Sequence, residues 1–380
     1  MKKRKTTIFS TLIIFISLSI IFIPGCSKGE KTEEQKVIKI GAILPLTGNL
    51  SFIGKLNKNG IDLAVKDINE KSSEEEKQIQ VIYEDSKSSS TDGVSAMNKL
   101  INIHNINVII VSTTNIAAAC APIAEKSEVI EIAMSPQPEI ANLGSNIFRI
   151  FPSSGQEAEI LAKHIANKGI NNVAILYSQD DYGTACKISF ENFFKQLGGK
   201  VIQEDSYIEG QQDVKSQILN IKQTSPEAIV MFGFGRTYPS ILKNLKEQSI
   251  DIGIYGNLAF NNAPIKQIAP KERENIVFTV PSFNLNKLQN EKVTEYIREY
   301  KENYKSEPDH SSAYFYDTVI LLFEAIKRAN NKTASIKNEL FRVKDFRGIT
   351  GNISIDANGD SRTSIDLAYY QNGIAVPINK

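Results

Sequence analysis

The sequence is poor in the side chains on which metal centres and disulfide frameworks depend. Its 380 residues contain three histidines, three cysteines and no tryptophan. These numbers are too small for a large Cys/His cluster or for a fold held together by several disulfides. An excess of charge is also missing, because 44 Lys and Arg residues face 43 Asp and Glu residues and leave a net charge of +1. We therefore do not expect a strongly basic protein that binds nucleic acid.

Recognisable catalytic motifs are missing as well. The sequence has no Gly-x-Ser-x-Gly turn, phosphate-binding loop or dinucleotide fingerprint. Residues 356–360 resemble the start of a calcium loop, but Ser361 and Leu367 stand where an EF-hand needs glycine and glutamate. The sequence therefore predicts no metal, no cofactor and no catalytic residues. An enzyme that uses a cleft for catalysis is the least favoured of the alternatives.

The first residues have the layout of an export signal. Residues 2–5 are all basic, residues 8–23 form an apolar stretch, and Cys26 follows a small residue. This pattern predicts a lipoprotein signal peptide over 1–25, a lipid attached to Cys26, and a polar tether over 26–36. The alternative is a transmembrane anchor with an incidental cysteine, but the apolar stretch is shorter than the ~20 residues that span a bilayer. We expect an extracytoplasmic protein that its lipid holds on the membrane.

From residue 37 onward, apolar runs of strand length alternate with helical patterns, in two series. The first series has strands at 37–43, 79–83, 108–111, 129–133 and 147–150, and the second has strands at 173–176, 200–204, 228–232, 252–255 and 276–280. Continuous apolar strands separated by helices are typical of a parallel sheet covered on both faces. The sequence therefore predicts an α/β protein with two doubly wound lobes.

The last hundred residues do not simply extend the second series. Helical patterns at 290–304, 311–328 and 335–343 are followed by short strands around Asn-Gly turns. We expect the chain to cross between the lobes three times, near Phe151, Pro281 and Phe346, and so to form a hinge. The expected N-terminal lobe is 37–150 plus 282–345, and the C-terminal lobe is 151–281 plus 346–380. Cys120 and Cys186 fall in different halves and are expected to be free, buried thiols.

Several segments, in this order, resemble the leucine/isoleucine/valine-binding protein family, the type I solute receptors of bacterial ABC importers. They include IKIGAILPLTG at 38–48, GIDLAVKDIN at 60–69, APIA at 121–124, DYG at 181–183 and NGD at 358–360. The resemblance implies a type I periplasmic binding fold whose lobes close on a small molecule, an amino acid or related metabolite. It also implies delivery of the ligand to a membrane permease. We further expect a monomer without enzyme activity. A lipoprotein that senses the ligand for a membrane receptor is the alternative.

The first lobe offers candidate ligand contacts after two of its strands. Thr113 and Thr114 open the helical pattern at 116–126, where the free N–H groups of a helix N-terminus suit an anion. Thr114 aligns with the serine that binds the ligand carboxylate in the family. Ordinary N-capping explains the same residues without a ligand. Met134 and Ser135 follow the next strand, where the family contributes backbone groups and a hydroxyl, although a plain turn explains them nearly as well.

The second lobe offers aromatic candidates. Tyr182 lies at the carboxyl end of a strand, where α/β folds place ligands, and its ring and hydroxyl could both meet a ligand. Phe234 follows another strand, and Tyr238 could replace it under a shifted alignment. Ile53 lies in the loop after the first strand and is expected to form part of the side-chain pocket.

One position departs from the family. Amino-acid receptors of this kind bind the α-ammonium group through a glutamate, and the resemblance places Leu258 there. A buried ammonium without a carboxylate costs several kcal/mol, roughly. Either another acid reaches the ligand, or the ligand is an amide, a carboxylate or another small metabolite.

Overall fold

A computed structural model describes residues 37–72, 78–261, 265, 267–281, 291–329 and 332–378. The expected signal peptide, the tether and the lipidated Cys26 lie outside these ranges. No helix in the described ranges has the length and apolar character needed to cross a membrane.

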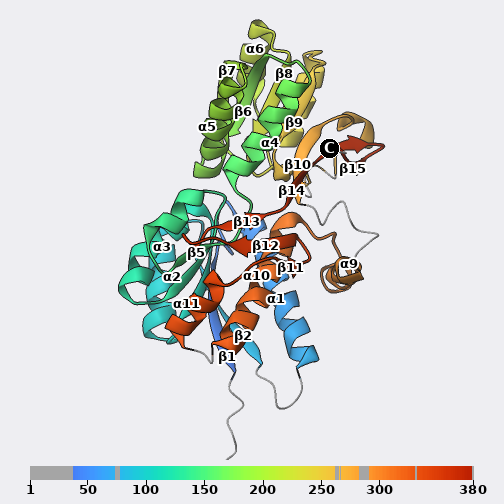
Figure 1. The fold of residues 1–380 in the computed structure, drawn as a ribbon. Coiled ribbons are helices and arrows are strands. Elements are labelled where there is room, and N and C mark those ends of the chain that lie inside the picture. The colour runs from blue at the N-terminus through green and yellow to red at the C-terminus, as the bar shows by residue number, and fades with distance from the viewer. Residues whose placement is uncertain are drawn as a thin grey trace, which may run out of the picture. The chain divides into compact units, whose positions relative to one another are not determined.

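The first lobe is built on a five-stranded parallel sheet with the order β2-β1-β3-β4-β5. Its strands are β1 (Ile38–Leu44), β2 (Ile79–Asp85), β3 (Val108–Ser112), β4 (Ile130–Met134) and β5 (Ile147–Arg149). Its helices are α1 (Ser51–Lys71), α2 (Ser90–Asn102), α3 (Thr114–Lys126), the 3-10 helix η1 (Pro138–Leu143), α9 (Glu291–Tyr304), α10 (His310–Arg328) and α11 (Thr333–Phe341). Helices α1 and α10 lie on one face of the sheet and helices α2 and α3 on the other (Figure 1). Their side chains bury both faces.

The second lobe is built on a seven-stranded sheet with the order β15-β14-β10-β9-β8-β6-β7. Its strands are β6 (Asn172–Ser178), β7 (Lys200–Tyr207), β8 (Ala228–Phe232), β9 (Gly253–Gly256), β10 (Val277–Pro281), β14 (Ile365–Gln371) and β15 (Ile374–Pro377). Its helices are α4 (Ser154–Asn167), α5 (Asp181–Gln196), α6 (Lys215–Thr224), α7 (Tyr238–Glu247), and the 3-10 helices η2 (Leu258–Asn261) and η3 (Pro270–Glu272). Strands β6 to β10 are parallel, whereas β14 runs antiparallel to β10, and β15 pairs antiparallel with β14 at the edge of the sheet. The predicted α/β class with two doubly wound lobes is confirmed.

The lobe boundary expected at residue 346 is wrong. Strands β11 (Phe346–Gly348), β12 (Gly351–Ile355) and β13 (Ser361–Thr363) form a separate three-stranded sheet. Ile353 and Ile355 of this sheet pack in the same core as β1 and α10. The small sheet therefore belongs to the first lobe, and its strands lie next to α10 in Figure 1. The last crossing therefore lies between Thr363 and Ile365, and only β14 and β15 join the second lobe. The sequence pattern did not indicate the position of this crossing, because the strands of the small sheet are short and partly polar.

Arg149 links two of the crossings. Its guanidinium is fully buried and donates hydrogen bonds to the carboxylate of Asp360 and to the carbonyl of Phe151. It also donates to the carbonyls of Ser135 at 2.9 Å and Ser361 at 3.0 Å. One side chain thus ties the first crossing, after β5, to the segment that leads into the last one.

The thiols of Cys120 and Cys186 are free and buried, as expected from the sequence. Cys120 lies on α3 and Cys186 on α5. Burial raises the pKa of both thiols, and neither is therefore a reactive thiolate.

Candidate functional site

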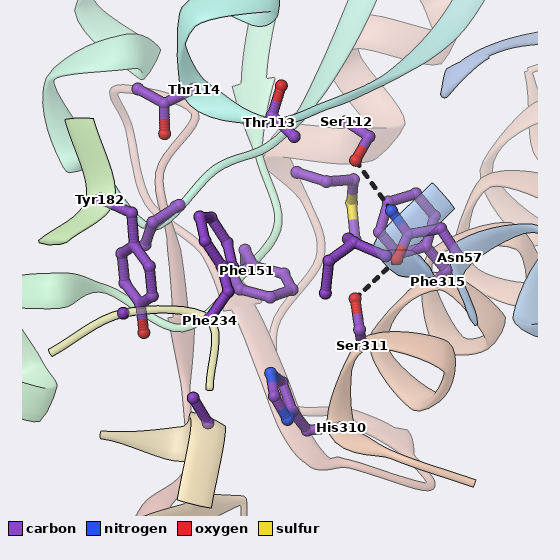
Figure 2. A pocket seen from close by; sticks show the side chains of 15 residues that line it. Asn57, Ser112, Thr113, Thr114, Phe151, Tyr182, Phe234, His310, Ser311 and Phe315 are labelled. Carbon is purple, nitrogen blue, oxygen red and sulfur yellow. Dashed lines mark hydrogen bonds between the residues drawn. The ribbon is translucent and has the colours of Figure 1, made fainter. Parts of the chain in front are cut away.

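Residues of both lobes line one cavity of about 50 Å3. The first lobe and the crossing after it contribute Ile53, Asn57, Ser112, Thr113, Thr114, Met134, Pro136, Phe151, His310, Ser311 and Phe315; the second contributes Tyr182, Gly233, Phe234 and Ala259 (Figure 2). The lining residues of the parallel strands lie at or just beyond their carboxyl ends, where open α/β sheets hold ligands. The volume is below the ~150 Å3 of a cavity that holds benzene. A larger guest therefore requires the lobes to separate or the lining side chains to move.

The N-terminus of α3 opens onto this cavity. Thr113 occupies the N-cap position with φ +74°, and its side chain makes no capping hydrogen bond. Its hydroxyl is instead 3.2 Å from Oδ1 of Asn115. The first helical hydrogen bond is the one from the N–H of Ala117 to the carbonyl of Thr113. Because no N-cap side chain occupies the first turn, plain capping does not account for these threonines, and the turn is suited to an anion.

The hydroxyl of Thr114 is held by its neighbour. Thr114 Oγ1 and Ser135 Oγ share a hydrogen bond of 2.9 Å, and Ser135 Oγ also accepts from the N–H of Gln137 at 3.1 Å. Ser135 is fully buried and is not among the lining residues. Its place is behind Thr114, where it orients the threonine side chain.

Asn57 provides a polar patch in the first-lobe wall, on the side away from Thr114 (Figure 2). Its side chain donates to Oγ of Ser112 at 2.8 Å and accepts from the hydroxyl of Ser311 at 2.6 Å (Figure 2). Asn57 follows Ile53 by one turn on the buried face of α1, and Ser311 lies in the first turn of α10. Three segments far apart in the sequence thus meet in one small hydrogen-bonded group.

The second-lobe wall is apolar and aromatic. The rings of Tyr182 and Phe234 lie 5.2 Å apart between centroids, and Gly233 and Ala259 complete this wall. The hydroxyl of Tyr182 does not serve the cavity, because it donates to Oε1 of Glu157 at 3.0 Å and accepts from the side-chain amide of Asn257 at 2.8 Å. Only the ring of Tyr182 is left for a ligand, which corrects the expectation that its hydroxyl would contribute.

Glu157 is a carboxylate buried behind this wall. It lies in the first turn of α4 and is fully buried. Its Oε2 accepts from the N–H of Leu258 at 3.0 Å and from the hydroxyl of Thr279 at 2.7 Å. Burial raises the pKa of this carboxyl, and the hydrogen bonds from Thr279, Leu258 and Tyr182 oppose the rise. Glu157 is therefore an acid near the site, of the kind that the sequence analysis considered as an alternative partner for an ammonium group. Both of its oxygens, however, already accept hydrogen bonds from protein donors.

Most of the residues expected to bind a ligand line the cavity, namely Ile53, Thr113, Thr114, Met134, Tyr182 and Phe234. Ser135 and Leu258 do not. Leu258 is buried, its N–H is used by Glu157, and its neighbour Ala259 takes the place at the cavity wall.

Sequence reasoning missed several lining residues, among them Asn57, Phe151, His310, Ser311 and Phe315. A signal existed for Asn57, since a polar residue one turn after Ile53 faces the core side of an amphipathic helix. His310 and Ser311 follow Asp309, whose carboxylate caps α10 by accepting from the N–H of Ser312. A cap motif marks the start of a helix, but nothing in it shows which cavity that start faces.

The side chains of Arg236 and Gln137 connect the lobes next to residues of the cavity. Arg236, in the loop before α7, donates to the carbonyl of Asn49 at 3.1 Å, and its guanidinium lies 5.2 Å from the ring centre of Phe52. Gln137 donates from Nε2 to the carbonyl of Asp181 at 3.2 Å. The structure therefore has interlobe hydrogen bonds that an opening movement would break.

The fold and the interlobe cavity define a two-lobed solute receptor, and comparison with known proteins agrees. Residues 37–372 match the periplasmic binding protein family. The chain belongs to this family, and its resemblance to the leucine/isoleucine/valine-binding proteins is confirmed. Members of the family bind solutes, and membership implies an extracytoplasmic location.

Individual relatives are distant in sequence. The Leu/Ile/Val-binding protein homolog 3 of Brucella melitensis is 22% identical over 343 residues, covering 88% of this chain and 92% of that protein. The LivJ substrate-binding protein of Streptococcus pneumoniae, solved with isoleucine, is 25% identical with a TM-score of 0.80, covering 91% and 100% of the two chains. A solute-binding protein of Rhodopseudomonas palustris, solved with 3,4-dihydroxybenzoic acid, has the same TM-score at 24% identity, covering 90% and 96%. One fold thus holds an amino acid in one protein and an aromatic acid in another.

Proposed function

We propose that this protein captures a small solute, an amino acid, amide or small carboxylate, in the interlobe cavity and releases it unchanged to an ABC permease. The observation that carries the proposal is the cavity itself, which combines residues of both lobes with an uncapped helix N-terminus. A ligand that contacts both walls favours the closed arrangement over the open one, because only the closed arrangement supplies both sets of contacts.

The interlobe hydrogen bonds support the closure step. The bonds from Arg236 to Asn49 and from Gln137 to Asp181 add to whatever the ligand contributes. A hydrogen bond between neutral groups, such as the one from Gln137, contributes about 0.5–1.5 kcal/mol, and one from a charged group, such as the exposed Arg236 guanidinium, contributes somewhat more, so these contacts alone shift the balance modestly. Ligand contacts supply the remaining free energy that favours closure, and the permease recognises the closed form.

Delivery to a permease requires the receptor to stay at the membrane. The export signal over 1–25 and the lipid on Cys26, both read from the sequence, would provide this attachment. The polar tether over 26–36 would let a monomer reach the permease.

The experiment is a thermal-unfolding screen of the purified full chain against amino acids, amides and carboxylates. A ligand present at 100 times its Kd adds about 2.7 kcal/mol to the free energy of unfolding and raises the melting temperature. Phe234→Ala should lose affinity for the compound found. Phe341→Ala is the matched control, because it also removes a partly buried ring but lies outside the cavity. A chain that no compound in the screen stabilises is not a solute receptor of this kind.

A further inference from the structure

Three buried polar side chains stand together among apolar neighbours in the first-lobe wall of the cavity. Asn57 of α1, Ser112 of β3 and Ser311 of α10 form this polar patch, and all three line the cavity (Figure 2). Their exposed fractions are 0%, 2% and 3%, so bulk water does not reach them. Ile53 and Phe315 lie one helical turn away, on α1 and α10, and line the same cavity. A hydrogen-bonding surface thus faces a confined space between apolar side chains.

The three groups of the polar patch hold one another in place. The amide of Asn57 donates to Oγ of Ser112 at 2.8 Å, and its oxygen accepts from the hydroxyl of Ser311 at 2.6 Å. Helices α1 and α10 approach closely beside them, since a Cβ on Gly60 would lie 2.0 Å from the carbonyl oxygen of Ser312. This contact between the two backbones keeps Asn57 beside Ser311. The patch is therefore preorganised, and a ligand does not have to order it.

The polar patch retains hydrogen-bonding capacity that the protein does not use. A side-chain amide has two N–H donors and an oxygen that accepts twice, and a hydroxyl has one donor and two lone pairs. Among the described residues, Asn57 donates once and accepts once, and no acceptor is present for the O–H of Ser112. Within the same ranges, Ser311 donates one hydrogen bond and accepts none. Donors and acceptors thus remain side by side, a combination that a hydroxyl or a carboxamide can satisfy.

The groups of the polar patch are neutral. No aspartate, glutamate, lysine or arginine is among the described residues that line the cavity. The acid closest to the patch in sequence is Asp309, whose Oδ1 caps α10 by accepting from the N–H of Ser312. Its Oδ2 is buried and has no hydrogen-bond partner in the described part of the chain, so a cation is the rival occupant. Asp309 does not line the cavity, and a patch of neutral groups favours a neutral partner.

We propose that the solute carries an uncharged hydroxyl or carboxamide group and that this group binds to Asn57, Ser112 and Ser311. The remainder of the solute lies against the apolar side chains of the cavity, among them Phe234. This inference rests on the proposed function, because it names the class of ligand that the same cavity selects. A solute with a methyl group in this place leaves buried polar atoms unpaired, and such a mismatch reduces affinity far more than a change in apolar size does.

The test uses pairs of compounds of nearly equal shape in which methyl groups replace the polar group: valine and threonine, leucine and asparagine, 3-methylbutanoate and 3-hydroxybutanoate, 4-methylbenzoate and 4-hydroxybenzoate. Calorimetric titration of the purified full chain gives the Kd of each compound. In the pair whose frame fits, the polar compound should bind at least about tenfold more tightly, which corresponds to about 1.4 kcal/mol. Equal affinity, or tighter binding of the methyl compound, overturns the inference, because the patch then does not select a polar group.

An apolar patch should reverse the preference. The triple variant Asn57→Leu, Ser112→Ala and Ser311→Ala removes the three polar side chains together, a change that is close to neutral for folding because no bonded partner is left behind. It should shift the affinity ratio in the best pair toward the methyl compound by about tenfold or more. Ser112→Ala alone is the smallest of these changes, should shift the ratio in the same direction, and serves as the test if the triple variant does not fold.

Thr318→Val is the matched control for these variants. Thr318 is also a buried hydroxyl residue of α10, but it does not line the cavity. The control should leave the affinity ratio at that of the unmodified chain. An unchanged ratio in the patch variants, or an equal shift in the control, overturns the inference.

A charged probe tests the rival occupant. 2,4-Diaminobutanoate carries an ammonium group where homoserine carries a hydroxyl, so the two compounds compare a cation with a neutral group at the patch. Tighter binding of 2,4-diaminobutanoate overturns the uncharged group and points to a cation beside Asp309.

The wider screen distinguishes failure of this inference from failure of the proposed function. A hit that has neither a hydroxyl nor a carboxamide overturns the ligand class and leaves solute capture intact. A hit that has such a group is compared with its own methyl analogue, with the same tenfold criterion, roughly. A screen without any hit overturns both proposals.

Discussion

Glu131 is the side chain whose replacement should change stability most clearly with pH. It lies in β4, and the alternation of the strand turns it away from Ile130 and Ile132 toward the side of α3, near Cys120. It is fully buried, and neither carboxylate oxygen has a hydrogen-bond partner among the described residues. Burial alone raises the pKa of this carboxyl well above its ordinary value.

The sign of the pH effect follows from that raised pKa. In the unfolded chain the carboxyl loses its proton near pH ~4.3, whereas in the folded chain it keeps the proton to a higher pH. Its contribution to stability is therefore complete below pH ~4.3 and is lost as the pH rises toward the folded pKa, at about 1.4 kcal/mol per pH unit. Above the folded pKa the loss is complete.

Two variants separate the charge from the burial of a polar group. Glu131→Gln cannot ionise but keeps a buried polar group, so its free energy of unfolding should exceed that of the unmodified chain by an amount that grows with pH. Glu131→Met also removes the unsatisfied polar atoms, which should add about 1–3 kcal/mol at every pH. Urea unfolding followed by circular dichroism from pH 5 upward measures both differences, and the difference for Glu131→Gln should grow by ~1.4 kcal/mol per pH unit until the folded pKa is reached. Parallel curves for Glu131→Gln and the unmodified chain would refute the reasoning, because they would mean that Glu131 titrates normally in the folded protein.

Three further substitutions test the site and its supports. Tyr182→Phe removes the hydroxyl that donates to Glu157. We expect the free energy of unfolding in urea to fall by about 1–3 kcal/mol, whereas ligand affinity measured by calorimetry should change little. The reverse pattern would place the hydroxyl in the cavity. Arg236→Ala breaks the interlobe hydrogen bond to the carbonyl of Asn49. It should weaken ligand binding by about 2- to 10-fold without altering the unfolding curve. Unchanged affinity would show that this contact plays no part in closure. Arg149→Met leaves several buried acceptors without a donor and should lower the free energy of unfolding by about 3–5 kcal/mol in urea, a loss that a surface ion pair would not produce.

The two-lobed architecture was predictable because its signal is strong in each segment. Apolar runs such as β3 and β8 are buried along their whole length, as strands covered on both faces must be. The last crossing was not predictable, because β11 to β13 are short and partly polar. Only packing against the core of the first lobe shows where Ile353 belongs.

The candidate site was predictable only where position along a strand implies position in the cavity. Thr114 and Phe234 follow strands, and the rule that ligands lie beyond carboxyl ends places them correctly. Glu157 shows the limit of this reasoning. In the sequence it is an acid in the first turn of a helix, which the helix dipole explains without any reference to a ligand. Its place behind Tyr182 depends on how α4, α5 and η2 pack, which local pattern does not encode.

The discontinuous lobes set the order in which the chain can finish folding. Residues of α10, among them Phe315, Leu322 and Ile326, fill the core on one face of the first sheet, yet they follow nearly the whole second lobe along the chain. A nascent or partly exported polypeptide that ends at Pro281 would carry every strand of the first sheet while leaving apolar surface of that sheet uncovered. Such a chain stays incompletely packed until its last quarter arrives, a state that suits passage through a narrow secretion channel and exposes the polypeptide to proteases if synthesis stops early.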